Sequence, residues 1–286
     1  MSAKGYFKIL AFLSGLAVFS LATDVCLAKS SSKRNKPQRA AKKTYHVSAQ
    51  SAIFSDAVHQ RRLYAKKIHK KVQPASTTKV MTALLVMERL PLNKVVTVSP
   101  SVKDAQPSRL HLKPGEQYKV SDLLYAILLN SANDAAIVLA ESVAGSEEKF
   151  VQLMNARARQ LGASHTRFAN STGLPNKGVP QYTTAYDMSL IFRQALLHPF
   201  FKEAVGRKHK TIYSRAGRKI TLKSHNKMLF TQWGKNVHGK TGYTRAAQAC
   251  FVGYTTQGGR TFILAVFGCS RRWDDIKHLV KKYSFH

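Results

Sequence analysis

The segment from Pro74 to Glu88 is apolar at nearly every position after Lys79. A helix that is apolar on all sides is surrounded by protein, so this pattern predicts a buried helix. Its polar residues gather in the first turn, where Ser76 and Lys79 stand three positions apart. Residues at that spacing share one face of a helix. The serine and the lysine are therefore predicted to touch inside the protein.

Four further apolar patterns predict helices in the middle of the chain. They cover Ser121–Leu129, Asn133–Ala144, Ser146–Leu161 and a segment from Thr183 or Thr184 to Leu197. Gly145 and Gly162 stand where the second and third of these helices should end. Ser146 is a predicted N-cap, because Glu147 and Glu148 follow it in the first turn.

Strands are predicted mainly at the two ends of the remaining chain. Residues 45–56 and 58–66 alternate weakly between polar and apolar side chains, and strand-like patterns return from Thr211 onward. The runs Cys250–Tyr254 and Thr261–Gly268 flank a turn-like segment and predict a β-hairpin. Helices in the middle and most strands late make the predicted fold class α+β.

The last predicted helix combines an apolar stripe with several basic residues. The stripe consists of Trp273, Ile276, Val280 and Tyr283. Packing of this stripe on the sheet is the expected arrangement. A helix lying on a membrane surface is the alternative, because basic amphipathic helices bind there.

The first 28 residues have the pattern of a secretory signal peptide. Lys4 and Lys8 precede an apolar run over residues 9–22, and Cys26–Ala28 offers small residues for cleavage. The run is short for a transmembrane helix. Retention as an N-terminal anchor is the alternative to cleavage. We therefore expect an exported protein, periplasmic or extracellular and associated with the cell wall.

The charge of the chain constrains its partners. The sequence holds 46 Lys and Arg against 14 Asp and Glu, a formal net charge of +32. In an intracellular protein this excess would suggest nucleic acid. Export instead suggests anionic wall polymer or a membrane surface, and no nucleic acid is expected. A generally basic proteome is the plain alternative.

Residues 29–44 are basic and lack an apolar period, which predicts a flexible linker. Residues 45–286 are then expected to form one domain, with no C-terminal β domain. Cys250 and Cys269 remain after the signal segment. Two buried thiols are expected there, and a disulfide is the alternative.

No cofactor or metal ion is expected. The stretch Gly234–Thr241 matches the phosphate-binding pattern G-x-x-x-x-G-K-T, but strand-like residues follow it where that loop requires a helix. The histidines are scattered, and no zinc-binding spacing of His or Cys occurs.

Ser-x-x-Lys occurs four times, beginning at Ser30, Ser76, Ser146 and Ser224. Three of these are predicted at the surface or at a helix cap, and only Ser76 opens a buried helix. A serine becomes a good nucleophile when a base takes its proton, and a lysine can serve if its pKa is lowered. A shift from about 10.4 to about 7 corresponds to ~4 to 5 kcal/mol. Only burial or a neighbouring cation supplies that much.

Three motifs follow one another in order: Ser76-x-x-Lys79, Ser131-x-Asn133 and Lys240-Thr241-Gly242. Together they are the signature of penicillin-recognising serine enzymes. Over roughly residues 45–270 the chain resembles the D-alanyl-D-alanine carboxypeptidases among the low-molecular-mass penicillin-binding proteins. The resemblance implies a β-lactamase/transpeptidase-like fold, an antiparallel sheet flanked by helices with a helical subdomain. Gln248 departs from the family, in which a glycine is usual at that position.

The resemblance also implies a mechanism. Ser76 would attack the carbonyl between the two terminal D-alanines of a peptidoglycan stem peptide and pass its proton to Lys79. The backbone N–H groups of Ser76 and Tyr243 would form the oxyanion hole. Ser131 would relay a proton to the leaving amine.

The remaining motif residues are implied to bind the substrate. Asn133 would contact the substrate backbone, and Lys240 would add positive charge and help to keep Lys79 neutral. Thr241 and Thr244, on either side of Gly242 and Tyr243, would bind the terminal carboxylate.

β-Lactams are the expected covalent inhibitors. The glutamates after Ser131 show no Glu-x-x-x-Asn pattern, so slow-releasing acylation is expected rather than rapid hydrolysis. The nearest alternative function is a D,D-endopeptidase that cuts peptidoglycan cross-links with the same residues. From another class, a catalytically inactive, basic cell-wall-binding protein is the alternative.

Overall fold

The computed structural model describes residues 45–284 apart from residue 177. The predicted signal segment and basic linker, residues 1–28 and 29–44, lie outside the described residues.

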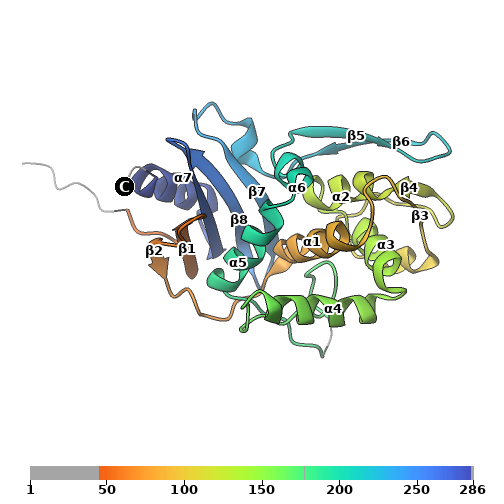
Figure 1. Ribbon diagram of the computed structural model, residues 1–286, viewed down its shortest axis with the longest axis horizontal. Helices are drawn as coiled ribbons and strands as arrows, with labels where there is room; N and C mark the ends of the chain where they lie inside the picture. The colour runs from red at the N-terminus through yellow and green to blue at the C-terminus, as the bar shows by residue number, and fades with distance from the viewer. Residues whose placement is uncertain (1–44, 177, 285–286) are drawn as a thin grey trace, which may run out of the picture. The chain divides into compact units, whose positions relative to one another are not determined.

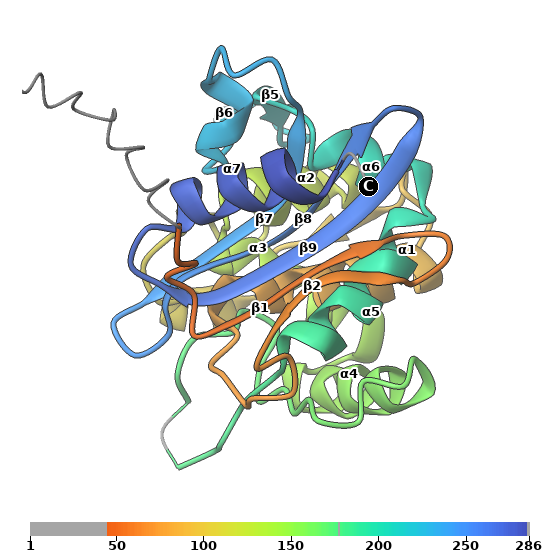
Figure 2. The same ribbon diagram turned by 90° about the vertical axis from the view of Figure 1, so that its left-hand side faces the viewer.

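A five-stranded antiparallel sheet forms the centre of the described domain, with strand order β2-β1-β9-β8-β7 (Figure 2). Its strands are β1 (Ser51–Asp56), β2 (Arg62–Lys66), β7 (Val237–Thr244), β8 (Gln248–Gln257) and β9 (Arg260–Cys269). The predicted hairpin is confirmed as β8–β9, which joins β1 near the start of the chain. β7 lies at one edge of this sheet.

One face of the sheet is covered by α5 (Ala185–Leu196), and α1 (Lys79–Arg89) packs against α5 (Figure 1). α1 is buried at every position from Lys79 to Val86, as its apolar sequence predicts. α5 begins after Thr184, whose side chain accepts a hydrogen bond from the Asp187 backbone N–H. The prediction of a cap at this position is confirmed.

Three more helices pack around α1 and form the helical part of the domain (Figure 1). They are α2 (Val120–Leu129), α3 (Asn133–Ala144) and α4 (Glu147–Gln160), and all three were predicted. α3 ends at Gly145, which has a left-handed φ of 80°. Ser146 caps α4 by accepting from the Lys149 backbone N–H. A short helix, α6 (Pro199–Ala204), was not predicted.

Two small sheets lie apart from the main one. They pair β3 (Val95–Thr97) with β4 (Gln117–Lys119), and β5 (His209–Tyr213) with β6 (Lys219–Lys223). The strand pattern after Thr211 was predicted, but its first two strands form a hairpin of their own. Three 3-10 helices complete the domain, η1 (Ala75–Thr78), η2 (Pro100–Asp104) and η3 (Lys227–Phe230).

The other face of the main sheet is covered by α7 (Arg272–Tyr283) (Figure 2). Ile276, Leu279 and Val280 are buried against the sheet, so the prediction of packing is confirmed. Asp275 of this helix accepts hydrogen bonds from the Tyr45 hydroxyl, at 2.7 Å, and from the backbone N–H groups of residues 48 and 49. Within the described residues, no helix is long and apolar enough to cross a membrane.

Both cysteines are buried free thiols, which confirms that prediction. Burial raises the pKa of Cys250 to about 11, and it raises the pKa of Cys269 further. Both thiols therefore stay protonated near neutral pH, because an apolar environment disfavours the thiolate.

Candidate active site

The buried helix begins with a tight turn that brings Ser76 and Lys79 together. Ser76 lies in η1, and Lys79 is the first residue of α1. A 3-10 helix has three residues per turn, so side chains three apart are eclipsed. The Lys79 Nζ atom lies 3.3 Å from the Ser76 Oγ atom. Ser76 is half-buried, whereas Lys79 is completely buried.

Lys79 is surrounded by hydrogen-bond acceptors. Besides Ser76, its Nζ atom donates to the Asn133 Oδ1 atom at 2.7 Å and to the Thr172 carbonyl at 2.9 Å. Burial holds its pKa well below the ordinary value, and the charge of Lys240 lowers it further. A lysine that loses its proton near neutral pH has a free electron pair, and can take a proton from a neighbouring hydroxyl.

Lys240 is the second buried lysine, and it comes from the edge strand β7. Its Nζ atom donates to the Ser131 Oγ atom at 3.1 Å and to the Thr241 carbonyl at 2.9 Å. Burial lowers its pKa to about 7, and the charge of Arg272 contributes to this. Ser131 lies in the short link between α2 and α3 with a left-handed φ of 60°. The second and third motifs are thus joined by one hydrogen bond.

A cavity of about 250 Å³ opens over these groups. Its lining includes members of all three motifs: Ser76, Ser131, Asn133, Thr241, Gly242 and the adjacent Tyr243. Lys79 and Lys240 are buried behind the lining and bond to Ser76 and Ser131, so the structure brings the three motifs together. Thr244 does not line the cavity, because its hydroxyl accepts from the Ala247 backbone N–H in the turn after β7.

Gly242 allows β7 to pass close to the start of the buried helix. A Cβ atom at this position would lie 3.2 Å from the backbone nitrogens of Ser76 and Thr77. That distance is tighter than ordinary van der Waals contact, so a side chain would push the strand away from the turn. The glycine keeps the Tyr243 backbone near the Ser76 N–H, where the oxyanion hole is predicted.

Asn133 is fixed on both sides of its amide. Its Oδ1 atom accepts from Lys79, and its Nδ2 atom donates to the carbonyls of Gln106 at 3.2 Å and Pro107 at 2.6 Å. Its backbone N–H donates to the Ser108 carbonyl at 2.8 Å. Because all these groups belong to the protein, the side chain orients Lys79. Its predicted contact with the substrate backbone stays a prediction.

The sequence reasoning missed five residues of the cavity lining, of which two, Arg272 and His225, can carry charge. Arg272, at the start of α7, donates to the carbonyls of Gly242 at 3.0 Å and Cys250 at 2.9 Å. His225 follows β6, and burial together with Lys240 lowers its pKa. Arg272 was counted only among the basic residues of a helix, and no local pattern distinguishes it from its neighbours.

Other sequence motifs considered above can also be located in the fold. Ser224 is buried, which corrects the expectation of a surface position, and Asn226 beside it is buried as well. The Asn226 Nδ2 atom donates to the Val237 carbonyl and so holds the start of β7. The stretch Gly234–Thr241 runs into β7 rather than opening a helix. Among the described residues, no group of three His, Cys, Asp or Glu could hold a metal ion.

Gln248 stands in a position that explains why glycine is usual there. It is the first residue of β8 and has a φ of 56°. Glycine adopts this left-handed conformation without steric cost, whereas other residues are strained. Its Nε2 atom donates to the Arg245 carbonyl at 2.6 Å, which stabilises the turn in this chain.

Comparison with known proteins gives one consistent result. The family model described as D-alanyl-D-alanine carboxypeptidase matches residues 36–271. The chain is 34% identical over 228 residues to the D-alanyl-D-alanine carboxypeptidase DacF of Bacillus subtilis, covering 78% of this chain and 58% of that protein. It is 34% identical over 218 residues to DacB2 of Mycobacterium tuberculosis, covering 76% of this chain and 74% of that protein.

The fold matches solved structures of the same kind. One is the crystal structure of a D-alanyl-D-alanine carboxypeptidase from Mycobacterium tuberculosis H37Rv, with a TM-score of 0.77, 31% identity and coverage of 84% of this chain and 93% of that one. Another is the Streptomyces K15 DD-transpeptidase, with a TM-score of 0.76, 27% identity and coverage of 85% and 98%. These likenesses confirm the predicted fold class. The chain belongs to the D-alanyl-D-alanine carboxypeptidase family.

Proposed function

We propose that this protein is a serine D,D-carboxypeptidase, which removes the terminal D-alanine from peptidoglycan stem peptides through an acyl-enzyme. One observation carries the proposal: a fully buried Lys79 with a lowered pKa lies 3.3 Å from the hydroxyl of Ser76, which lines the cavity. Family membership supports the same reaction class.

Acylation starts with the hydroxyl of Ser76. Lys79 takes its proton as the Oγ atom bonds to the carbonyl carbon between the two D-alanines. The carbonyl oxygen gains negative charge, and the backbone N–H groups of Ser76 and Tyr243 stabilise it. The short approach of β7 at Gly242 supports this assignment.

Release of D-alanine requires a proton on the leaving amine. Ser131 can supply it, because its Oγ atom lies in the same cavity and accepts a hydrogen bond from Lys240. Lys240 also disfavours a proton on Lys79, since two buried ammonium groups repel each other. Water then attacks the ester bond and frees Ser76.

The terminal carboxylate of the substrate needs a positive partner. Thr241 offers a hydroxyl in the cavity, and Arg272 adds a guanidinium group beside Gly242. Guanidinium groups bind carboxylates strongly. We therefore assign carboxylate binding to Thr241 and Arg272, and we give Thr244 no direct part, because its hydroxyl belongs to the neighbouring turn.

β-Lactams should acylate Ser76 and leave slowly. None of the described residues that line this cavity is an aspartate or glutamate. Glu147 instead accepts from the backbone N–H and hydroxyl of Ser171. A carboxylate that could activate the deacylating water is therefore not in the cavity lining.

A fluorescent penicillin tests the proposal. Incubation with the purified protein, followed by denaturing electrophoresis and mass mapping, should place the label on Ser76. Ser76→Ala and Lys79→Ala should abolish labelling. Ser146→Ala, which alters another Ser-x-x-Lys sequence at the cap of α4, should label like the wild type. Folded wild-type protein without label would refute the catalytic proposal, and the basic wall-binding protein would take its place.

The endopeptidase alternative rests on one relative. The chain is 27% identical over 244 residues to a D-alanyl-D-alanine endopeptidase of Pseudomonas aeruginosa, covering 84% of this chain and 78% of that protein. Parallel assays with a monomeric pentapeptide and a cross-linked dimer separate the two activities. Faster cleavage of the monomer supports the carboxypeptidase.

We further propose export to the periplasm or cell surface, from the signal pattern of residues 1–28, and contact with an anionic wall polymer or membrane surface, from the charge of +32. Such contact is electrostatic and should weaken as salt rises. Retention on isolated cell wall that does not change with salt, or with deletion of residues 29–44, would contradict it.

A further inference from the structure

One loop forms a wall of the cavity and also fixes Asn133. The loop runs from residue 105 to residue 116, between η2 and β4. Pro107 and Ser108 line the cavity. The carbonyls of Gln106, Pro107 and Ser108 accept all the hydrogen bonds that Asn133 donates from its backbone and side-chain amides. The position of this loop therefore sets the position of the Asn133 Oδ1 atom relative to the Lys79 Nζ atom.

The loop has an unfavourable backbone conformation. Ser108 has a φ of 73° and His111 a φ of 56°. Both values fall in the left-handed region, which residues other than glycine avoid. Such a conformation persists only where the surroundings hold it. The bonds that hold this loop are therefore part of what keeps the cavity in shape.

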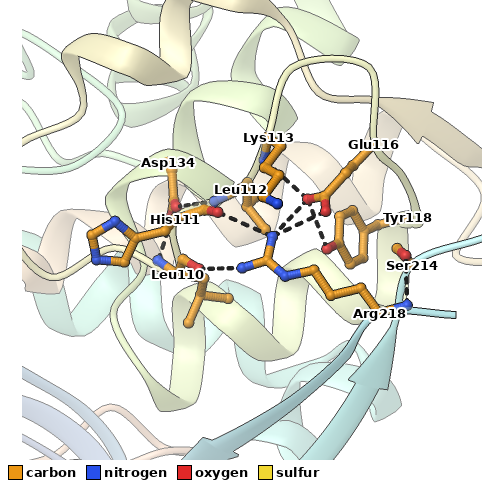
Figure 3. Close-up of polar contacts among 9 residues, drawn as sticks. All are labelled: Leu110, His111, Leu112, Lys113, Glu116, Tyr118, Asp134, Ser214 and Arg218. Carbon is orange, nitrogen blue, oxygen red and sulfur yellow. Dashed lines mark hydrogen bonds and ion pairs between the residues drawn. The ribbon is translucent and has the colours of Figure 1, made fainter. Parts of the chain in front are cut away.

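Besides Asn133, two side chains from outside the loop bond to its backbone (Figure 3). Asp134 accepts from the backbone N–H groups of Leu110 at 2.8 Å and Leu112 at 3.1 Å. Arg218 donates to the carbonyls of Leu110 at 3.1 Å and His111 at 3.0 Å. The Asp134 carboxylate thus accepts from the backbone amides of residues 110–112, and the Arg218 guanidinium donates to the carbonyls of the same segment.

Arg218 also pairs with a carboxylate at the end of the same loop. Its Nη1 atom lies 3.0 and 2.8 Å from the two carboxylate oxygens of Glu116 (Figure 3). Glu116 also accepts from the Lys113 backbone N–H and the Tyr118 hydroxyl. The chain has only 14 acidic residues for 46 basic ones. Carboxylates are thus scarce relative to basic residues, and one of them pairs with Arg218.

Arg218 comes from a distant part of the chain. It lies in the turn of the β5–β6 hairpin, where its backbone N–H donates to the Ser214 hydroxyl at 3.0 Å. At the other end of β6, His225 lines the cavity. The hairpin thus reaches from one side of the cavity to the loop on the other.

We propose that Arg218 is a positioning residue for the acylation of Ser76. It holds the 105–116 loop, the loop orients Asn133, and Asn133 aligns Lys79 with the serine hydroxyl. This inference rests on the proposed function. Arg218 does not line the cavity, so it acts through the loop and not on the substrate.

The test compares Arg218→Gln, Arg218→Lys and Arg215→Gln, with the wild type measured in parallel. Arg215 is an exposed residue of the same turn, so its variant is matched in charge and place. In Arg218→Gln the rate constant of acylation by penicillin should fall roughly tenfold to a hundredfold, since small misalignments at a reacting centre cost that much. The noncovalent affinity should change less. Arg218→Lys should recover part of the rate, and Arg215→Gln should match the wild type.

Hydrogen exchange supplies a readout that does not depend on activity. The amides of Leu110 and Leu112 should exchange faster in Arg218→Gln than in Arg215→Gln, while circular dichroism shows both variants folded. An unchanged acylation rate constant, or a loss confined to noncovalent affinity, would overturn the proposal. A wild type that is not acylated at all would refute the proposed function instead, and the exchange data would still report on the loop.

Discussion

The two faces of the main sheet hold different cores. Toward α1 the structure buries two lysines, Lys79 and Lys240, together with Asn133. Toward α7 the core is aliphatic and aromatic, and the carboxylate of Asp275 ties the first described residues to the helix. Buried charge costs folding free energy, whereas apolar burial supplies it. Apolar packing supports both faces, and the α1 side has the larger apolar cluster. We infer that the two lysines on the α1 side serve activity at a cost in stability, whereas the α7 side contributes to stability alone.

Replacing Lys79 tests the α1 face with the largest expected effect. Lys79→Met keeps the length of the side chain and removes the base. We expect penicillin acylation to fall about a thousandfold, within the usual range for a lost general base. The melting temperature should stay the same or rise, because a buried amine is replaced by an apolar group. A clear fall in melting temperature would show that the lysine stabilises the fold.

Truncating the α7 core tests the other face. Leu279 is fully buried against the sheet, so Leu279→Ala should lower the free energy of unfolding by about 2 to 5 kcal/mol. The acylation rate per folded molecule should not change. Lys281→Ala, on the exposed side of the same helix, is the control and should affect neither quantity. Denaturant titration and penicillin labelling measure the two effects, and a parallel loss of both would contradict the separation.

Gly242→Ala should lower the acylation rate by a change at the edge strand β7. Its Cβ atom would crowd the backbone nitrogens of Ser76 and Thr77 at 3.2 Å. Loss of one oxyanion contact costs a hundredfold or more, and partial displacement should cost about tenfold. Thr244→Ala, two residues along the same strand and outside the cavity lining, should cost less. Equal losses of acylation rate in the two variants would indicate that Thr244 binds the substrate after all.

The smallest expected effect is a pH dependence of stability that arises from the buried lysines. The pKa of Lys240 is about 7 in the folded protein and near its ordinary value when unfolded, so the unfolded state binds more protons between these values. The free energy of unfolding should therefore rise from pH 7 to pH 9, by up to about 1.4 kcal/mol per pH unit from one such group. Above about pH 9 the buried thiols should offset this rise, because thiols ionise more readily in the unfolded chain while the lowered pKa values of Lys240 and Lys79 still favour the folded state up to about pH 10.4. Lys240→Met should reduce this rise in the free energy of unfolding. An unchanged slope would show that Lys240 does not cause it.

Much of the fold could be predicted from local patterns. Capping at Ser146 and Thr184 and the stop at Gly145 depend on neighbouring residues, and each was found where it was predicted. The buried character of α1 follows from its composition alone. The three motifs meet in one cavity, as their order along the chain suggested.

The rest depends on contacts that no local pattern records. Arg272 and His225 reach the cavity only because α7 begins and β6 ends beside it. Ser131 takes a left-handed φ without being glycine, so its sequence gives no sign of it. Arg218 and Glu116 stand 102 positions apart, and many other basic residues resemble Arg218 in sequence.

The pairing of β1 with β9 joins the two ends of the domain. Ser51 is opposite Phe267 in the sheet, and Tyr45 bonds to Asp275 at a separation of 230 positions. Pairings this distant require a large loop to close, and they slow folding. During synthesis, β1 has no partner on one side until nearly the whole domain has been made. The central sheet can therefore close only after β9 has been made, although the helices between β1 and β9 can form earlier.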